Sequence, residues 1–399
     1  MDLDQSHLNE VRAALAPVRL VDSTLREGLQ SDTRPVDSAR KLDIAALLAA
    51  FGVDCIEVGN PVSSERARAD ARRLAGLDLG STRVLAHVRC HPEDIRAAVD
   101  TGVDGLNLFI PCSPLLRHAS LGRSLDELIE IAVGALELAR ALRPELELRI
   151  TPEDSFRTPV PELERFCGAV TSRVRVDRVG LADTVGVAHP RAVEARFARL
   201  RQRFDLDLEF HGHNDTGCAV ANALLAREAG ATHVDVTVLG LGERNGITAL
   251  EGFVAALLVH DPDAVHGRLR LELLPLLTRA VADAFGVEIP RNSCLVGANS
   301  FAHKAGVHTN AMLRDRRSYE FVDPQLMGVE RRLLAGHEMT GASVLGARAQ
   351  ALGLDLSPEQ LRRLAASVRT SASHGALASE TIDELLLASV CAPERAQGL

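Results

Sequence analysis

Short apolar runs alternate along the first two thirds of the chain with longer stretches whose apolar residues recur at helical spacing. Eight of these runs have the length and the branched or leucine-rich composition of buried β-strands. They cover residues 18–24, 53–59, 82–88, 104–110, 146–151, 176–182, 206–211 and 232–238. Between them, stretches such as 39–51 and 125–142 carry apolar residues at helical spacing and predict helices. The pattern therefore predicts strands and helices in alternation.

This alternation predicts an α/β fold with a closed parallel (β/α)8 barrel, the TIM barrel. An open doubly wound sheet would give a similar alternation, but the count of eight favours the barrel. In such barrels the loops that follow the strands build the active site. Polar residues at the ends of the predicted strands are therefore the candidates for function.

The chain is longer than one such barrel needs, because it has 399 residues and a barrel of this type takes about 250. We expect residues 1–285 to form the barrel, with an N-terminal helix. Residues 286–399 are expected to form a linker and a smaller, mainly helical domain. In that region, residues 357–360 (SPEQ) predict a helix start, since Ser caps, Pro suits the first position and Gln follows three residues after Ser.

The seventh predicted strand ends in residues 211–215 (HGHND). Two histidines two residues apart on a strand project from the same face, so His211 and His213 can reach one divalent cation. An ordinary polar pair at a strand end is the alternative. Other polar residues at or after strand ends predict one polar rim; these are Arg26, Glu27, Gln30, His87, Arg149, Thr151 and Thr184.

A glycine-rich segment, residues 240–246 (GLGERNG), follows the eighth strand. Glycines at this spacing let the backbone approach a ligand closely, although a plain turn fits the pattern equally well.

Four segments together carry a resemblance to a known family. They are residues 22–28 (DSTLREG), 211–215, 240–246 and 303–308 (HKAGVH). In this order they resemble the signatures of the metal-dependent Claisen-condensing barrel family, which contains homocitrate, isopropylmalate and citramalate synthases. The resemblance runs from about residue 18 to about residue 350. Within the family, HGHNDTGCAVAN and GERNGIT are most similar to homocitrate synthases.

The resemblance implies a divalent metal ion held by Glu27, His211 and His213, with a 2-oxo acid completing the coordination. Such a site suits Mg2+, Mn2+, Zn2+ or Co2+. The cation would polarise the keto group, and Arg26 is placed to stabilise the developing oxyanion. The implied reaction is an acyl transfer, in which acetyl-CoA condenses with the oxo acid and the thioester is then hydrolysed.

Condensation requires removal of a proton from the acetyl methyl group. By resemblance, Glu153, His308 and Tyr319 match the catalytic glutamate, histidine and tyrosine of the family. Because His308 and Tyr319 lie beyond the barrel, the C-terminal region is expected to fold over an active site. In this family that site is commonly in the partner subunit, which implies a homodimer.

The choice of oxo acid depends on Arg149, which lies two residues before Thr151 and so on the same face of the barrel. This geometry suits a clamp for a distal carboxylate or phosphonate. The resemblance implies that homocitrate synthases carry this arginine and isopropylmalate synthases do not, and that Gln30, His87 and Thr184 contact the oxo acid. We therefore expect 2-oxoglutarate as the substrate and homocitrate as the product.

The sequence departs from the homocitrate synthase pattern near the pocket, at Leu29, at 59–60 (GN), at 111–112 (PC) and at 151–152 (TP). These departures leave open the same chemistry on phosphonopyruvate or phosphinopyruvate, as used in phosphonate antibiotic biosynthesis. Isopropylmalate or citramalate synthesis is less favoured.

Three other classes of protein fit the sequence less well. A related lyase would carry a catalytic cysteine in the loop after the eighth strand, and residues 240–250 contain none. A biotin-dependent carboxyltransferase would need a lysine at the metal, but the lysines are Lys41 and Lys304. A non-catalytic binding protein would be expected to have lost part of the catalytic set.

Charge and cysteine content agree with an enzyme of small molecules. The net charge of -9 and the pI of about 5.9 argue against a nucleic-acid partner or an anionic membrane surface. The first residues, MDLDQSHLNE, do not resemble a secretory signal. Seven cysteines without CxxC spacing predict reduced thiols rather than a zinc knuckle or a disulfide framework. A cytoplasmic protein is expected.

Overall fold

The computed structural model describes residues 17–391. By their contacts these residues form two compact units, divided between Ile289 and Pro290. The predicted N-terminal helix falls in residues 1–16 and so lies outside the described residues.

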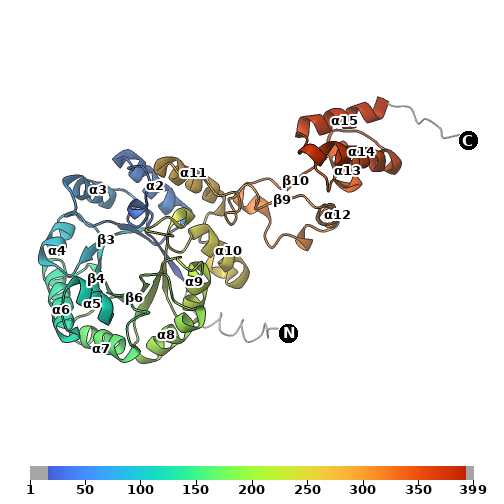
Figure 1. Cartoon of the computed structure of the whole chain (residues 1–399). Helices are drawn as coiled ribbons and strands as arrows, with labels where there is room; N and C mark the ends of the chain where they lie inside the picture. The colour runs from blue at the N-terminus through green and yellow to red at the C-terminus, as the bar shows by residue number, and fades with distance from the viewer. Residues whose placement is uncertain (1–16, 392–399) are drawn as a thin grey trace, which may run out of the picture. The chain divides into compact units, whose positions relative to one another are not determined.

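The first unit is a closed barrel of eight parallel strands in sequence order, with helices around it (Figure 1). The strands are β1 (Arg19–Asp22), β2 (Cys55–Val58), β3 (Arg83–Arg89), β4 (Gly105–Pro111), β5 (Glu147–Glu153), β6 (Arg178–Asp183), β7 (Asp207–Gly212) and β8 (His233–Val236). Pairing of β8 with β1 closes the ring. The predicted barrel is confirmed, and each strand lies within two residues of its predicted start and end.

The helices of this unit follow the strands and bury their apolar faces on the barrel. They are α2 (Ser38–Phe51), α3 (Glu65–Ala75), α4 (Pro92–Val99), α5 (Pro114–Ser120), α6 (Leu125–Leu142), α7 (Val160–Thr171), α8 (Pro190–Arg203), α9 (Ala219–Glu228), α10 (Leu250–His260) and α11 (Leu274–Phe285). Short 3-10 turns also occur at η1 (Gly28–Gln30), η2 (Val238–Gly240), η3 (Pro262–Ala264) and η4 (Leu271–Leu273). Helix α6 starts at a capping box of Ser124 and Glu127, which satisfies backbone donors of its first turn.

The interior of the barrel is only partly apolar. Val21, Cys55 and Leu85 form a small apolar cluster, whereas Arg149 and Arg178 are among the largest fully buried side chains. A barrel core of branched apolar residues is the usual arrangement. The charged side chains therefore need partners within the barrel.

These partners form a chain of alternating charges that we call the ion-pair ladder. It consists of Glu27, Arg26, Glu57, Arg149, Glu209, Arg178 and Glu147, each paired with the next. Arg26 Nε lies 2.5 Å from Glu57 Oε1, and Glu57 Oε2 lies 3.2 Å from Arg149 Nη2. Since every buried charge has an opposite neighbour, the ladder offsets the cost of removing these groups from water.

The second unit is mainly helical, as predicted. It contains α12 (Gly306–Arg314), α13 (Ala342–Ala351), α14 (Pro358–Ser371) and α15 (Ser379–Cys391), the turns η5 (Arg316–Ser318), η6 (Pro324–Met327) and η7 (Ala372–His374), and the paired strands β9 (Ala302–His303) and β10 (Arg332–Leu333). Ser357 and Gln360 form the expected capping box at the start of α14. The unit has its own apolar core, which includes Leu345, Val368 and Leu386.

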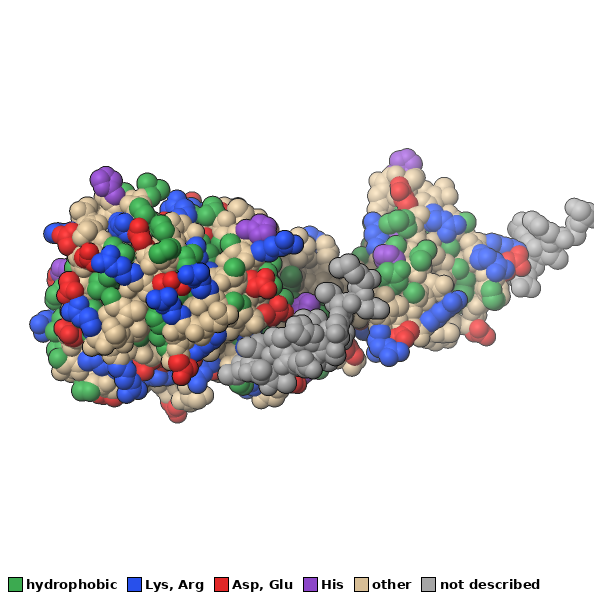
Figure 2. Space-filling model, turned by 90° about the horizontal axis from the view of Figure 1, so that it is seen from below, with side chains coloured by type: hydrophobic (Ala, Val, Ile, Leu, Met, Phe, Trp, Pro, Cys, Tyr) green, Lys and Arg blue, Asp and Glu red, His purple; other side chains and the backbone are tan. Residues whose placement is uncertain are grey.

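The surface carries charges of both signs. On the face seen in Figure 2, Lys and Arg side chains are interspersed with Asp and Glu, so this face presents no extended basic patch. Among the residues described, no helix is long and apolar enough to cross a membrane. Cys55, Cys112 and Cys167 are buried.

Candidate metal and substrate site

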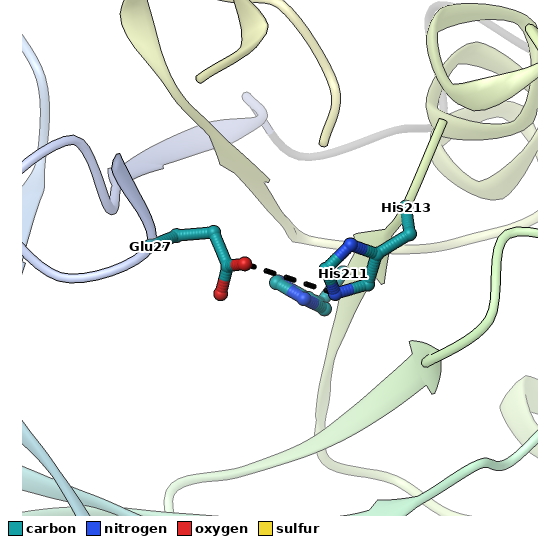
Figure 3. A group of neighbouring side chains, drawn as sticks. All are labelled: Glu27, His211 and His213. Atoms are coloured by element: carbon teal, nitrogen blue, oxygen red, sulfur yellow. Dashed lines mark ion pairs between the residues drawn. The ribbon is translucent and has the colours of Figure 1, made fainter. Parts of the chain in front are cut away.

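Glu27, His211 and His213 come together at the carboxyl end of the barrel strands. Their ligand atoms all lie within 4.8 Å of one another, and all three residues are buried. Figure 3 shows the Glu27 carboxylate directed at the two imidazoles. The distance from Glu27 Oε1 to His213 Nε2 is 3.9 Å. One carboxylate and two imidazoles form a donor set that fits a divalent transition metal.

Local backbone geometry explains how these residues meet. His211 lies on β7 and His213 directly follows this strand, so their side chains project to the same side. Glu27 follows β1 in a tight turn, in which Ser23 O accepts hydrogen bonds from the N–H groups of Arg26 and Glu27 at 2.9 and 2.7 Å.

Each histidine has one nitrogen available for a metal. Asp235 on β8 holds His211, with 2.7 Å between Oδ2 and Nδ1, which leaves Nε2 free to coordinate. Asp235 in turn accepts a hydrogen bond from Ser23 Oγ at 2.5 Å. The Nδ1 atom of His213 is buried without a hydrogen-bond partner among the described residues, while its Nε2 faces Glu27.

The protonation states also suit metal binding. Burial lowers the pKa of His211 to about 4, and the Arg26 charge acts in the same direction. Burial likewise lowers the pKa of His213 to about 4, with a further contribution from His211. Burial opposes ionisation of Glu27, yet Arg26 and the two histidines lower its pKa to about 2. At neutral pH the imidazoles are therefore neutral and the carboxylate is ionised, as metal ligands must be.

Arg26 lies beside the cluster and contacts three carboxylates. It pairs with Glu27, places Nε 2.5 Å from Glu57 Oε1 and places Nη2 3.5 Å from Asp235 Oδ2. Its guanidinium is therefore fixed next to the candidate metal ligands. This position fits the predicted role in stabilising an oxyanion.

Arg149 and Thr151 both point into the barrel, as their spacing predicted. Arg149, however, is paired with Glu57 and Glu209. Its guanidinium group therefore already has two carboxylate partners. A distal carboxylate of a substrate would have to replace one of them. The hydroxyl of Thr151 is buried and has no partner among the described residues, so it is available to a ligand.

The other predicted substrate contacts are His87, Thr184 and Gln30, and each has a different environment. The His87 ring stacks on Phe109, with 4.4 Å between the ring centroids. Burial, helped by the Arg26 charge, lowers the pKa of His87 to about 4. Thr184 Oγ1 accepts a hydrogen bond from the backbone N–H of Asp154 at 2.8 Å. Gln30 is exposed at the end of η1.

Glu153 stands at the end of β5, where burial raises its pKa to about 7. A carboxyl group with this pKa can accept or release a proton at neutral pH. In the second unit, the rings of His308 and Tyr319 stack with 4.1 Å between their centroids, and Tyr319 is 45% exposed. Their predicted contribution to the barrel site stays a prediction.

The glycine-rich turn contacts a candidate metal ligand. A Cβ at Gly242 would lie 2.9 Å from Glu27 Cγ, and one at Gly246 would overlap the carbonyl of Gly240. The N–H of Glu243 donates to Glu27 Oε1 at 3.1 Å. The glycines thus allow the turn to lie against Glu27.

Three carboxylates near the candidate metal ligands were not predicted from the sequence; these are Glu57, Glu209 and Asp235. Each is fully buried on a barrel strand. The available signal was an acidic residue within a short apolar strand, and Glu209 also stands two residues before His211, on the same face.

Comparisons with known proteins identify the family of the chain. The family model described as HMGL-like matches residues 17–281. A second model, described as homocitrate synthase post-HMGL domain-like, matches residues 295–376. The chain therefore belongs to the HMGL-like family. It also carries the additional domain that the second model describes, and the resemblance inferred from the four sequence segments is confirmed.

Curated relatives extend over most of the chain. The mitochondrial homocitrate synthase of Penicillium rubens is 40% identical over 370 residues, covering 93% of this chain and 77% of that protein. The cytosolic homocitrate synthase isozyme of Saccharomyces cerevisiae is 39% identical, covering 92% of this chain and 85% of that one. The (R)-citramalate synthase of Methanocaldococcus jannaschii is 33% identical over 348 residues, covering 87% of this chain and 69% of that protein.

Solved structures support the barrel. The HMG-CoA lyase of Bacillus subtilis superposes with a TM-score of 0.61 at 23% identity, covering 68% of this chain and 95% of that one. At this level of identity the likeness shows the fold alone.

Proposed function

We propose that the protein condenses acetyl-CoA with 2-oxoglutarate and hydrolyses the resulting thioester, releasing homocitrate and CoA. The observation that carries this proposal is the buried cluster of Glu27, His211 and His213 at the barrel mouth. The cluster lies in a chain that is 39–40% identical to curated homocitrate synthases over more than nine tenths of its length. The enzyme is thus an acyltransferase.

In this proposal Glu27, His211 and His213 hold a divalent cation, such as Mg2+, Mn2+, Zn2+ or Co2+. When bound, the cation polarises the keto group of the oxo acid and neutralises negative charge on its oxygen. Asp235 holds Nδ1 of His211, so that Nε2 is the atom that would bind the cation.

The protein side chains then perform the proton transfers and the charge stabilisation. His308, supported by Glu153, removes a proton from the acetyl methyl group, and the resulting carbanion forms a carbon–carbon bond to the keto carbon. Arg26 stabilises the alkoxide that develops. The alkoxide takes up the proton held by His308 and becomes the hydroxyl of the product, and Tyr319 assists these proton transfers. A water molecule then adds to the thioester carbonyl, and the CoA thiol leaves with a proton.

In this proposal Arg149 and Thr151, inside the barrel, select the oxo acid. Arg149 binds the distal carboxylate by exchanging one of its two carboxylate partners, Glu57 or Glu209, for the substrate. The unpartnered Thr151 hydroxyl donates to the same end of the substrate. His87, Gln30 and Thr184 complete the pocket.

We also propose a cytoplasmic homodimer in which His308 and Tyr319 serve the barrel of the partner. Several large apolar side chains of the second unit are exposed, among them Val307 at 75%, Phe321 at 62% and Met339 at 53%. In the proposed dimer these side chains offer apolar surface for the partner subunit to cover.

The test is release of CoA thiol from acetyl-CoA by the purified protein with Mg2+, Mn2+ or Zn2+. The oxo acids are 2-oxoglutarate, oxaloacetate, phosphonopyruvate, 2-oxoisovalerate and pyruvate. Turnover with 2-oxoglutarate supports the proposal, whereas turnover only with phosphonopyruvate assigns the enzyme to phosphonate metabolism. Preference for 2-oxoisovalerate would contradict the role of Arg149. His213→Ala should be inactive, and His118→Ala, which changes an exposed histidine, should be fully active.

A further inference from the structure

Asp215 and Arg244 form an ion pair at the rim of the barrel. Arg244 Nε lies 3.0 Å from Asp215 Oδ1, and Nη2 lies 3.1 Å from Oδ2. Asn245 Nδ2 adds a contact of 3.3 Å to Oδ1. Two parallel hydrogen bonds between a guanidinium and a carboxylate fix both direction and distance. Asp215 follows the β7 histidines, and Arg244 lies in the glycine-rich turn after β8, so the pair joins two loops.

The same pair reaches a third loop. Arg244 Nη2 also donates to the backbone oxygen of Thr184 at 2.8 Å, after β6. Gly186, in that loop, lies so close to Asp215 that a Cβ there would be 2.5 Å from Oδ2. Thr216 Oγ1 donates to Gly186 O at 2.7 Å. The loops after β6, β7 and β8 are therefore held together around one carboxylate.

The glycine-rich turn, residues 240–246, connects the ion pair to Glu27, a candidate metal ligand. Glu243, the neighbour of Arg244, donates its N–H to Glu27 Oε1, the oxygen that faces His213. Arg244 itself has a positive φ of 58°. This backbone conformation is unfavourable for a non-glycine residue and persists when its surroundings fix it. The ion pair with Asp215 and the hydrogen bond to Thr184 O together fix the Arg244 side chain.

We propose that Asp215 and Arg244 are positioning residues whose ion pair sets the affinity of the metal site by orienting Glu27 through the N–H of Glu243. The inference depends on the proposed metal centre. Neither side chain belongs to the Glu27, His211 and His213 cluster, and Arg244 is 37% and Asp215 21% exposed in their side chains. An exposed pair usually contributes little to overall stability. Its effect is therefore expected on the metal site rather than on folding.

The experiment compares Zn2+ affinity of the purified, metal-free protein and its variants by competition with a chromophoric chelator. Arg244→Gln and Asp215→Asn remove one charge each. Arg244→Lys keeps the charge but lacks the guanidinium group that forms two parallel hydrogen bonds. The matched control is Arg348→Gln, which breaks a two-bond pair with Asp383 in the second unit, with distances of 2.7 and 2.6 Å. Circular dichroism and the melting temperature establish that each variant is folded.

Supporting results are a loss of affinity of about 10-fold to 100-fold in Arg244→Gln and Asp215→Asn, the range typical of residues that orient metal ligands. Arg244→Lys should fall between these variants and the wild type, and Arg348→Gln should equal the wild type. Wild-type affinity in folded Arg244→Gln and Asp215→Asn would overturn this inference while the metal centre stands. Wild-type protein that binds Zn2+ no better than His213→Ala would overturn the metal centre itself.

Discussion

Asp235 is not itself a candidate metal ligand, but its contact with Nδ1 of His211 orients one. We predict that Asp235→Asn weakens metal binding by about 10-fold to 100-fold, because the carboxylate that orients His211 is lost. Equilibrium metal binding measured against a chelator checks this. Asp22→Asn is the control, since Asp22 is also a fully buried carboxyl on a neighbouring strand but lies outside the cluster. Equal losses in both variants would contradict the prediction.

Glu153 has a pKa near 7 because it is buried, so it is expected to titrate in the pH range of activity. We predict that Glu153→Gln lowers kcat by about 100-fold to 10,000-fold, the usual range for loss of an acid or base group. The KM for the oxo acid should change little. The pH profile of kcat/KM should also lose a transition near pH 7. A profile that keeps this transition would assign it to another group.

At this scale the sequence predicted which three side chains, Glu27, His211 and His213, come together, but not what surrounds them. The HxH spacing and the strand ends were visible along the chain. The partners of Arg149 were not, because Glu57 and Glu209 belong to strands that are distant in sequence and meet only across the barrel. The contact of Gly242 with Glu27 likewise depends on two loops more than 200 residues apart.

At the scale of elements, the ion-pair ladder makes the barrel strands depend on one another. Arg178 on β6 lies between Glu147 on β5 and Glu209 on β7. We predict that Arg178→Met lowers the free energy of unfolding by up to about 3–5 kcal/mol, because Glu147 and Glu209 each lose one of two arginine partners and keep only Arg83 and Arg149. Urea denaturation measures the loss. Arg173→Met, which breaks an exposed pair with Glu130, should cost at most about 1 kcal/mol.

Glu251 in helix α10 is expected to make the free energy of unfolding depend on pH. Burial raises the pKa of Glu251 to about 7, above the value of about 4.3 for an unfolded chain. A raised pKa favours the folded state below pH 4, and this contribution is lost as pH rises through 7. We predict that Glu251→Gln is more stable than the wild type at pH 8, by at most about 4 kcal/mol, and gains nothing at pH 4. Gln can still accept from Leu239 N–H. Equal gains at both pH values would exclude this cause.

The elements themselves were largely predictable. Each barrel strand is a short apolar run between turn residues, and the limits of α6 (125–142) were as expected. Strands β9 and β10 could not be predicted, because two residues are too few to show a pattern of alternation.

For the whole molecule, the proposed exchange of catalytic residues between subunits can be measured directly. His308→Ala lacks a residue of the second unit, and His213→Ala lacks a residue of the barrel, so each should be inactive alone. If each site uses residues of both subunits, mixed dimers contain one intact site. Denaturing and refolding the two variants together should then restore about a quarter of wild-type activity, because half the dimers are mixed and each has one intact site. A site built from one chain would show no recovery.

The ion-pair ladder also has a consequence for how this sequence can change over evolutionary time. A single substitution at Glu147, Arg178 or Glu209 leaves a buried charge with one opposite neighbour fewer, whereas a simultaneous change of both partners to apolar residues removes both charges. Such positions should therefore be replaced in pairs among descendants of a common ancestor. The ladder runs from Glu27 to Glu147. Substitutions near the amino ends of the strands are therefore constrained by the charges of Glu27 and Arg26 near their carboxyl ends.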